Sequence, residues 1–159
     1  MMLSGCRSRA SAPEQATEDP VALPYILSED PVVYDDICTL SDIEGLSAEY
    51  VRTEHGSCVY SLFNSHNKTY SLAEDCHLDV FVEDNWYRIQ YDQEAVGEGV
   101  VMAFTDMSYD IEPNCSRTER RSLEYYGVSD LVPGEYRLVL RGNRVHEPPQ
   151  WFYIPFTME

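Results

Sequence analysis

Apolar and polar residues alternate with a period of two over most of the chain beyond residue 45. The alternation is clearest in residues 57–63 and 78–83. A period of two sends successive side chains to opposite faces of a β-strand, whereas a helix repeats every ~3.6 residues. Turn-forming residues interrupt the alternation about every ten residues, which is typical of a sandwich or a barrel. The pattern therefore predicts an all-β fold.

The number and spacing of these runs predict an immunoglobulin-like β-sandwich of about seven or eight antiparallel strands. Residues 78–83 and 86–89 form the clearest hairpin, around Asp84 and Asn85. Pro155 cannot donate to a strand ladder, so the last strand should lie at a sheet edge or end there. Other strands are expected at residues 46–53, 57–63, 100–105, 116–124, 135–141 and 151–157.

A turn followed by an aromatic residue marks the start of the strand at 135–141. Pro133 and Gly134 supply the turn, and Tyr136 enters the strand. This arrangement is typical of a tyrosine corner, in which the phenol hydroxyl bonds a backbone group a few residues upstream. An ordinary Pro-Gly turn before a strand is the alternative interpretation.

Five short segments in order resemble a known family. They are residues 76–80, 85–87, 109–114, 125–127 and 131–138. Their order and spacing are similar to those of the bacterial immunoglobulin-like domain found in lipoproteins and secreted proteins, chiefly of Gram-positive anaerobes. The resemblance runs from about Gly45 to Met158. It implies a sandwich fold and an exported location, but it assigns no activity and no binding residue.

The first third of the chain has a different composition. No Lys or Arg occurs between Arg9 and Arg52, while acidic residues and prolines recur. Like charges repel and prolines remove backbone donors, so an extended segment is favoured over a packed element. We therefore expect an unstructured acidic linker over residues 7–36 and the sandwich domain over residues 37–159.

Residues 1–6 suggest an export signal. Leu3-Ser4-Gly5-Cys6 resembles a bacterial lipobox, in which the cysteine becomes the lipid-bearing first residue of the mature protein. Only five residues precede Cys6, so the charged and apolar regions of a signal peptide are missing, and a chance tetrad is the alternative. We expect a lipid on Cys6 to anchor the protein to the outer face of the bacterial cell membrane.

Four further cysteines are candidates for disulfides, which an exported protein permits. Cys58 and Cys76 are the favoured pair, because they would face each other if residues 57–63 and 71–77 formed a hairpin. Buried free thiols are the alternative. Cys38 and Cys115 are the other two, and the spacing of the four matches no zinc site.

Composition and motifs exclude several functions. The chain has 28 acidic and 11 basic side chains and a formal net charge of -17. Nucleic-acid binding is disfavoured, because contacts to phosphates require Lys and Arg. Hydrolase, nucleotide-binding and EF-hand motifs are absent from the sequence. We therefore predict no cofactor, no metal and no enzymatic activity.

Aromatic residues near two predicted strands are candidates for a binding surface, with core packing as the alternative. They are Tyr125, Tyr126, Trp151 and Tyr153. We expect a non-catalytic binding or adhesion module for an unknown protein or glycan outside the cell. The alternative function is proteinase inhibition, for which residues 96–99 or 143–146 would present the inhibitory loop.

Overall fold

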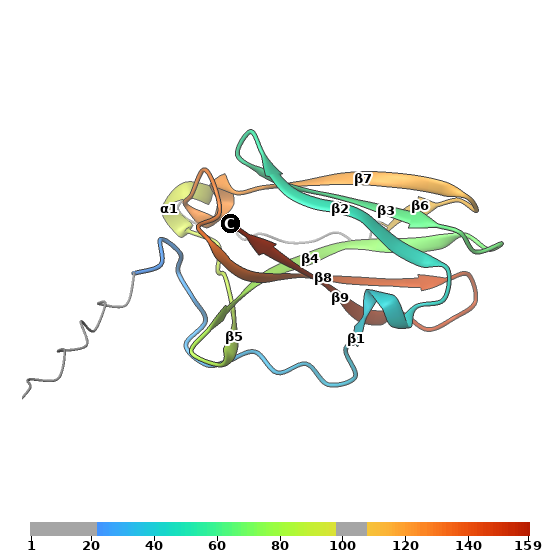
Figure 1. Cartoon of the computed structure of the whole chain (residues 1–159), viewed down its shortest axis with the longest axis horizontal. Helices are drawn as coiled ribbons and strands as arrows, with labels where there is room; N and C mark the ends of the chain where they lie inside the picture. Colours follow the sequence, from blue (N-terminus) through green and yellow to red (C-terminus); the bar gives the residue numbers. More distant parts are fainter. Residues whose placement is uncertain (1–21, 98–107) are drawn as a thin grey trace, which may run out of the picture.

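Two β-sheets pack face to face in the protein (Figure 1). The structure is a computed structural model, and it describes residues 22–97 and 108–159. The larger sheet has the strand order β1-β9-β8-β4-β5, with β6 also paired to β4, and the smaller sheet has the order β2-β3-β7. The strands are β1 (Cys38–Thr39), β2 (Leu46–Glu54), β3 (Ser57–Asn64), β4 (Tyr70–Val82), β5 (Asn85–Arg88), β6 (Ser108–Ile111), β7 (Cys115–Ser122), β8 (Gly134–Arg144) and β9 (Gln150–Met158).

Helical structure is limited, in the described residues, to three short segments. They are the 3-10 helices η1 (Leu40–Asp42) and η2 (Glu124–Tyr126) and the helix α1 (Gln93–Val96). In this part of the chain no helix is long and apolar enough to cross a membrane.

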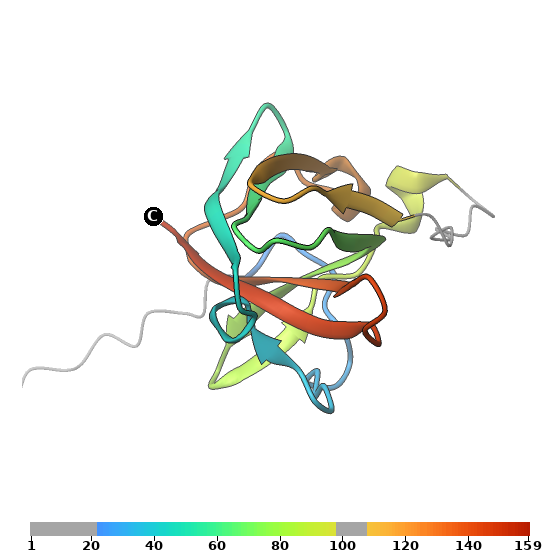
Figure 2. The same cartoon turned by 90° about the vertical axis from the view of Figure 1, so that its right-hand side faces the viewer.

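The prediction of an all-β immunoglobulin-like sandwich is confirmed. Figure 2 shows the two layers from the side. The described residues contain two short strands that the sequence pattern does not predict, β1 and β6, and β1 runs parallel to β9. The strand expected at residues 100–105 lies outside the described residues.

The hairpin expected from residues 78–83 and 86–89 is present. β4 and β5 pair from Asp79↔Arg88 to Val82↔Asn85. Glu83 and Asp84 form the turn, and both have positive φ, at 48° and 65°. Two positive φ values match the right-handed twist of the flanking strands, so this hairpin closes without glycine.

The hairpin between residues 57–63 and 71–77 that would place Cys58 opposite Cys76 does not form. β3 pairs with β2 and β7, whereas β4 belongs to the opposite sheet. The buried Asn64 amide stabilises this crossover by donating to Lys68 O at 2.8 Å and to Ile111 O at 2.9 Å. Alternation shows which side chains face the core, but it does not show which strand is the neighbour.

The core lies between the sheets. The larger sheet contributes Tyr70, Leu78, Leu138 and Phe152, and the smaller sheet contributes Leu62 and other side chains of β3. Each buried side chain of this size stabilises the fold by about 1.5–3 kcal/mol. These inward-facing residues follow the predicted period of two.

Tyr136 makes the hydrogen bond that defines a tyrosine corner. Its hydroxyl donates to Val132 O at 2.7 Å, just before Pro133 and Gly134 lead into β8. Tyr25 reinforces the corner from the N-terminal side. Its hydroxyl lies 3.0 Å from the Tyr136 hydroxyl and accepts a hydrogen bond from Val132 N at 2.8 Å.

Residues 22–36, which we call the strap, differ from the linker expected from the sequence. Tyr25 is only 7% exposed, and Leu27 forms a bridge with Ile89. Backbone hydrogen bonds of the strap follow the outer edge of β5. The strap is the blue segment that passes β5 and reaches β1 in Figure 1. Residues 22–36 therefore belong to the folded domain, and residues 1–21 lie outside the described residues.

The strap and β1 cover both edges of the larger sheet. Ser28 N donates to Arg88 O at 2.9 Å and Val32 N donates to Trp86 O at 2.7 Å, which occupies the free side of β5. At the other edge, β1 pairs with β9 only at Phe152 and Tyr153. Pro155 lies beyond this pairing, at the edge position that its missing N–H requires.

Candidate functional site

The four aromatic residues proposed as one binding surface do not lie together. Trp151 and Tyr153 are on β9, whereas Tyr125 and Tyr126 are on η2. Tyr126 is 3% exposed and stacks on Tyr91 with ring centroids 5.1 Å apart, so it belongs to the core. Tyr125 is 37% exposed and remains at the surface.

Trp151 and Tyr153 lie on the outer face of the larger sheet, where other side chains cover them. The Trp151 ring stacks on the His77 ring with centroids 5.5 Å apart, and its centroid lies 6.4 Å from that of Tyr34 in the strap. The guanidinium of Arg137 lies 5.7 Å from the Tyr153 ring centroid. These rings therefore pack within the sheet face rather than forming an open platform.

A buried ion pair lies at the centre of this face. The fully buried Asp79 accepts a hydrogen bond from Arg137 Nε at 2.9 Å and from the Tyr34 hydroxyl at 3.1 Å. Burial raises the pKa of Asp79, and the hydrogen bond from Arg137 opposes that rise. The Arg137 guanidinium also lies 4.6 Å from the Trp86 ring centroid. The arrangement satisfies a charge that would be costly to bury alone.

The four described cysteines are free thiols. Cys58 and Cys76 are buried in the core on strands of opposite sheets, so the hairpin that favoured their pairing is absent. Burial raises the pKa of Cys58 to about 12 and that of Cys76 to about 11. Cys38 donates to Trp151 O, and Cys115 is exposed at the start of β7. Cys6 lies outside the described residues.

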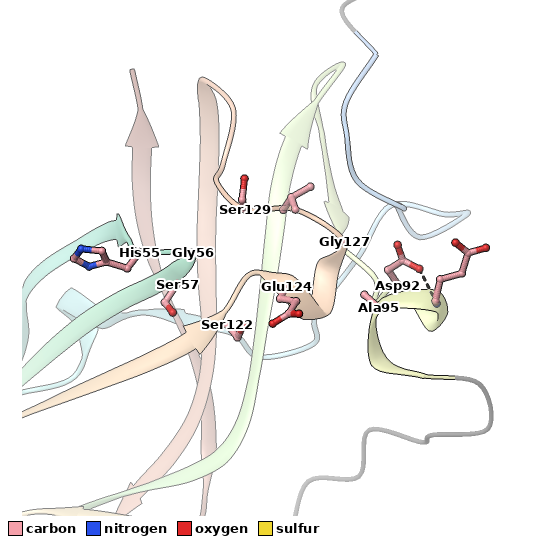
Figure 3. Close-up of a pocket in the computed structure, with 11 residues that line it drawn as sticks. His55, Gly56, Ser57, Asp92, Ala95, Ser122, Glu124, Gly127 and Ser129 are labelled. Carbon is pink, nitrogen blue, oxygen red and sulfur yellow. Dashed lines mark hydrogen bonds between the residues drawn. The ribbon is translucent and has the colours of Figure 1, made fainter.

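A pocket of about 690 Å³ lies at one end of the sandwich, where α1, η2 and the β2–β3 turn meet. We call it the end pocket (Figure 3). Its lining residues come from turns and strand ends that are far apart in the sequence. They are His55, Gly56, Ser57, Asp92, Glu94, Ala95, Ser122, Glu124, Gly127, Val128 and Ser129.

Backbone hydrogen bonds hold the walls of the end pocket together. Leu123 N donates to Gly56 O at 2.9 Å, and Asp92 N donates to Tyr125 O at 2.8 Å. Asp92 also caps α1, because its side chain accepts from Glu94 N at 2.9 Å. Gly127 has φ 74°, and a Cβ there would lie 2.5 Å from Asp92 Oδ2. Glycine therefore lets η2 end against α1.

A protein-family model described as a bacterial Ig-like domain matches residues 44–146, which include β2 to β8. The chain belongs to the bacterial Ig-like domain family. No curated protein matches the sequence. Membership indicates a non-catalytic module, and domains of this family are typically extracellular or surface-exposed. The strap lies outside the matched residues.

Carboxylates dominate the end pocket of this Ig-like domain. Asp92, Glu94 and Glu124 line it, and no Lys or Arg does. Serine hydroxyls add neutral hydrogen-bonding groups. Within residues 22–97 and 108–159, no group of three His, Cys, Asp or Glu side chains is arranged to hold a metal ion. The pocket can therefore accept hydrogen bonds from a cationic group of a ligand.

The loop at 143–146, one of two candidates for proteinase inhibition, forms a closed turn in the Ig-like domain. Glu147 N donates to Arg144 O at 2.9 Å, and the Asn143 amide donates to Glu147 O at 3.0 Å. The other candidate loop extends beyond the described residues at positions 98 and 99. The described contacts of residues 143–146 do not favour the inhibitor function.

The end pocket is hard to recognise from the sequence. Its lining comes from four separate segments, and no motif connects them. The visible signals are local, namely an Asp before a short helix at Asp92 and a Gly after another at Gly127. Each predicts a helix boundary but not the neighbour across the pocket.

Proposed function

We propose that this Ig-like domain is a non-catalytic binding or adhesion module, displayed outside the cell on a lipid at Cys6. In this proposal the end pocket holds a Lys- or Arg-containing segment of a partner protein. The carrying observation is a pocket of about 690 Å³ whose charged lining is acidic. Its volume falls within the ~300–1,000 Å³ typical of binding pockets.

Charge supports a protein partner over a neutral glycan. Glu94 and Glu124 are exposed, so a cation in the pocket would keep part of its hydration while meeting more than one carboxylate. Exposed pairs of this kind contribute modestly one at a time and are screened by salt. Binding should therefore weaken as ionic strength rises and should require several basic residues.

Titration of the protein with an oligolysine peptide, followed by NMR, tests the pocket. We expect saturable shifts at residues of the end pocket, and about tenfold weaker binding in the double variant Glu94→Gln, Glu124→Gln. The matched control is Glu112→Gln, which removes a charge next to Pro113 in a different pocket. Equal affinity of the wild type and the double variant would exclude the end pocket as the site.

Membrane fractionation tests the anchor. Cys6→Ala in the full-length gene should move the protein from the membrane fraction to the soluble fraction, because the thiol that carries the lipid is lost. Cys115→Ala, which removes an exposed thiol elsewhere, should leave the protein at the membrane. Membrane retention of the Cys6 variant would contradict lipidation.

A further inference from the structure

A second recess lies beside residues 88–93. It has a volume of about 310 Å³, at the lower end of the range for small-molecule sites. We call it the side pocket. Its lining residues are His77 of β4, Arg88 of β5, Ile89, Gln90, Tyr91, Gln93 of α1 and Tyr126 of η2.

Unlike three other pockets of the described residues, the side pocket is lined by a basic residue and by no acidic one. The end pocket contains Asp92, Glu94 and Glu124, and two further pockets contain Glu112 with Glu147 and Glu74 with Glu119. The side pocket has no Asp or Glu in its lining, although the chain carries a net charge of -17. Its charged lining residue is an arginine, which favours an anion.

Arg88 has unused capacity to bind an anion. It shares the single carboxylate of Asp79 with Arg137, and its own Nε lies 3.9 Å from Asp79 Oδ1. This Nε is buried and has no hydrogen-bond partner among the described residues. A buried donor without a partner is costly, and a carboxylate oxygen would satisfy it. The Arg88 side chain as a whole is 35% exposed and lines the side pocket, so its positive charge is available to a ligand there.

The rest of the lining provides neutral polar groups and an aromatic wall. Gln90 and Gln93 are exposed, and each amide can both donate to and accept from a hydroxyl. Tyr91 is half-buried and covers Tyr126, which gives the pocket an aromatic wall. Burial and the nearby Arg88 lower the pKa of His77 to about 4, so its imidazole is neutral at pH 7. Asp75 lies beside the pocket, with Oδ1 3.2 Å from His77 Nε2.

From this lining we infer that the side pocket binds a ligand with a carboxylate on a hydroxylated ring, the chemistry of an acidic sugar. Arg88 pairs with the carboxylate, Gln90 and Gln93 bond ring hydroxyls, and Tyr91 contacts the ring face. The inference concerns a different pocket and the opposite ligand charge from the proposed function. The two can therefore fail separately.

NMR titration with glucuronate, glucose and acetate tests the inference. We expect saturable shifts at the side pocket with glucuronate, and at least tenfold weaker binding of glucose and of acetate. Gln93→Glu places a like charge in the pocket and should weaken glucuronate binding about tenfold. Ala95→Glu is the matched control, because it adds the same charge on the same short helix but in the end pocket. Its affinity should stay within about twofold of wild type.

Three results would overturn the inference. They are no saturable shift with glucuronate, equal binding of glucose, and equal binding of acetate. Arg88→Gln should abolish the preference for glucuronate over glucose. Because Arg88 also contacts Tyr34 and Asp79, the thermal midpoint of this variant is measured alongside. Gln93 is exposed, so Gln93→Glu should fold, and it tests glucuronate binding in the side pocket if Arg88→Gln does not fold.

Discussion

The two sheets of this Ig-like domain face their surroundings in different ways. In the larger sheet the strap runs along β5 at one edge and β1 pairs with two residues of β9 at the other, and the outer face contains the buried Asp79–Arg137 pair. The smaller sheet ends in β2 and β7, for which the described residues supply no further strand. Its outer face contains exposed charged side chains such as Arg52 and Arg120.

The buried polar pair of the larger sheet contributes to the stability of the fold, whereas the charged side chains of the smaller sheet remain accessible to solvent. The carboxylate of Asp79 on the larger sheet is buried and needs its partner, whereas the guanidinium of Arg120 on the smaller sheet is solvated and can lose its partner at little cost. The end pocket and the side pocket both lie beside residues 89–95, which follow β5 in the chain. We infer that the strap stabilises the larger sheet and that binding takes place at this end of the sandwich.

Breaking the buried pair should have the largest effect. Arg137→Ala leaves the carboxylate of Asp79 in the sheet face without its closest cation, and we expect unfolding to become easier by about 3–5 kcal/mol. Arg120→Ala removes the same chemical group from the smaller sheet, where its side chain is 56% exposed, and should change stability by less than ~1 kcal/mol. Urea denaturation measures both, and equal losses would contradict the contrast between the sheets.

Lowering the pH should weaken the larger sheet through His77. Its pKa is lowered to about 4 from an ordinary value near 6.5, so the unfolded chain binds the proton more readily. Stability is therefore lost as pH falls from about 6.5 to about 4, by up to ~3 kcal/mol. Asp79 acts in the opposite direction, because burial raises its pKa and its protonation favours the folded state.

The comparison of variants isolates the contribution of His77. His77→Gln cannot take up the proton and should show a flatter loss of stability between pH 6.5 and 4. His55→Gln is the control, because His55 is 87% exposed at the β2–β3 turn. Parallel curves for wild type and His77→Gln would show that another group causes the acid sensitivity.

Loss of a hydrogen bond in the tyrosine corner should destabilise the domain less than loss of Arg137 or protonation of His77. Tyr136→Phe removes the hydroxyl that donates to Val132 O and should cost about 1 kcal/mol. Tyr25→Phe removes the acceptor of Val132 N and should cost a similar amount. Because the two hydroxyls contact each other, the double variant should lose less than the sum of the single losses. Additive losses in thermal unfolding would mean that the strap and the corner act independently.

The sequence predicted the fold better than it predicted surfaces. The period of two identified which side chains of β3, β4 and β8 face inward, because burial on one face imposes that alternation. It did not identify strand neighbours, so Cys58 and Cys76 were assigned to a hairpin that does not exist. The burial of Tyr25 cannot be predicted from the local sequence, because the residue it packs against, Tyr136, is more than a hundred residues away in the chain.

The candidate site was less predictable, because pockets form between segments that only the fold brings together. The sequence leaves Tyr126 open between a binding surface and core packing, and only the fold shows that it packs on Tyr91. Arg88 gave no signal as an anion site, since its spare donor is visible only once Asp79 and Arg137 are placed. Charge counts describe the whole surface and do not separate the two pockets.

The smallest change in stability is expected from a substitution at Cys115, on the edge strand β7 of the smaller sheet. Cys115 is exposed at the start of β7 and has no disulfide partner, so Cys115→Ser should change stability by less than ~0.5 kcal/mol. Cys58→Ser, on the neighbouring strand, places a hydroxyl in the core and should cost about 1–3 kcal/mol. Under oxidising conditions only an exposed thiol can join two copies. Non-reducing electrophoresis should therefore show dimers of the wild type and of Cys58→Ser that disappear in Cys115→Ser, and their persistence would place the reactive thiol elsewhere.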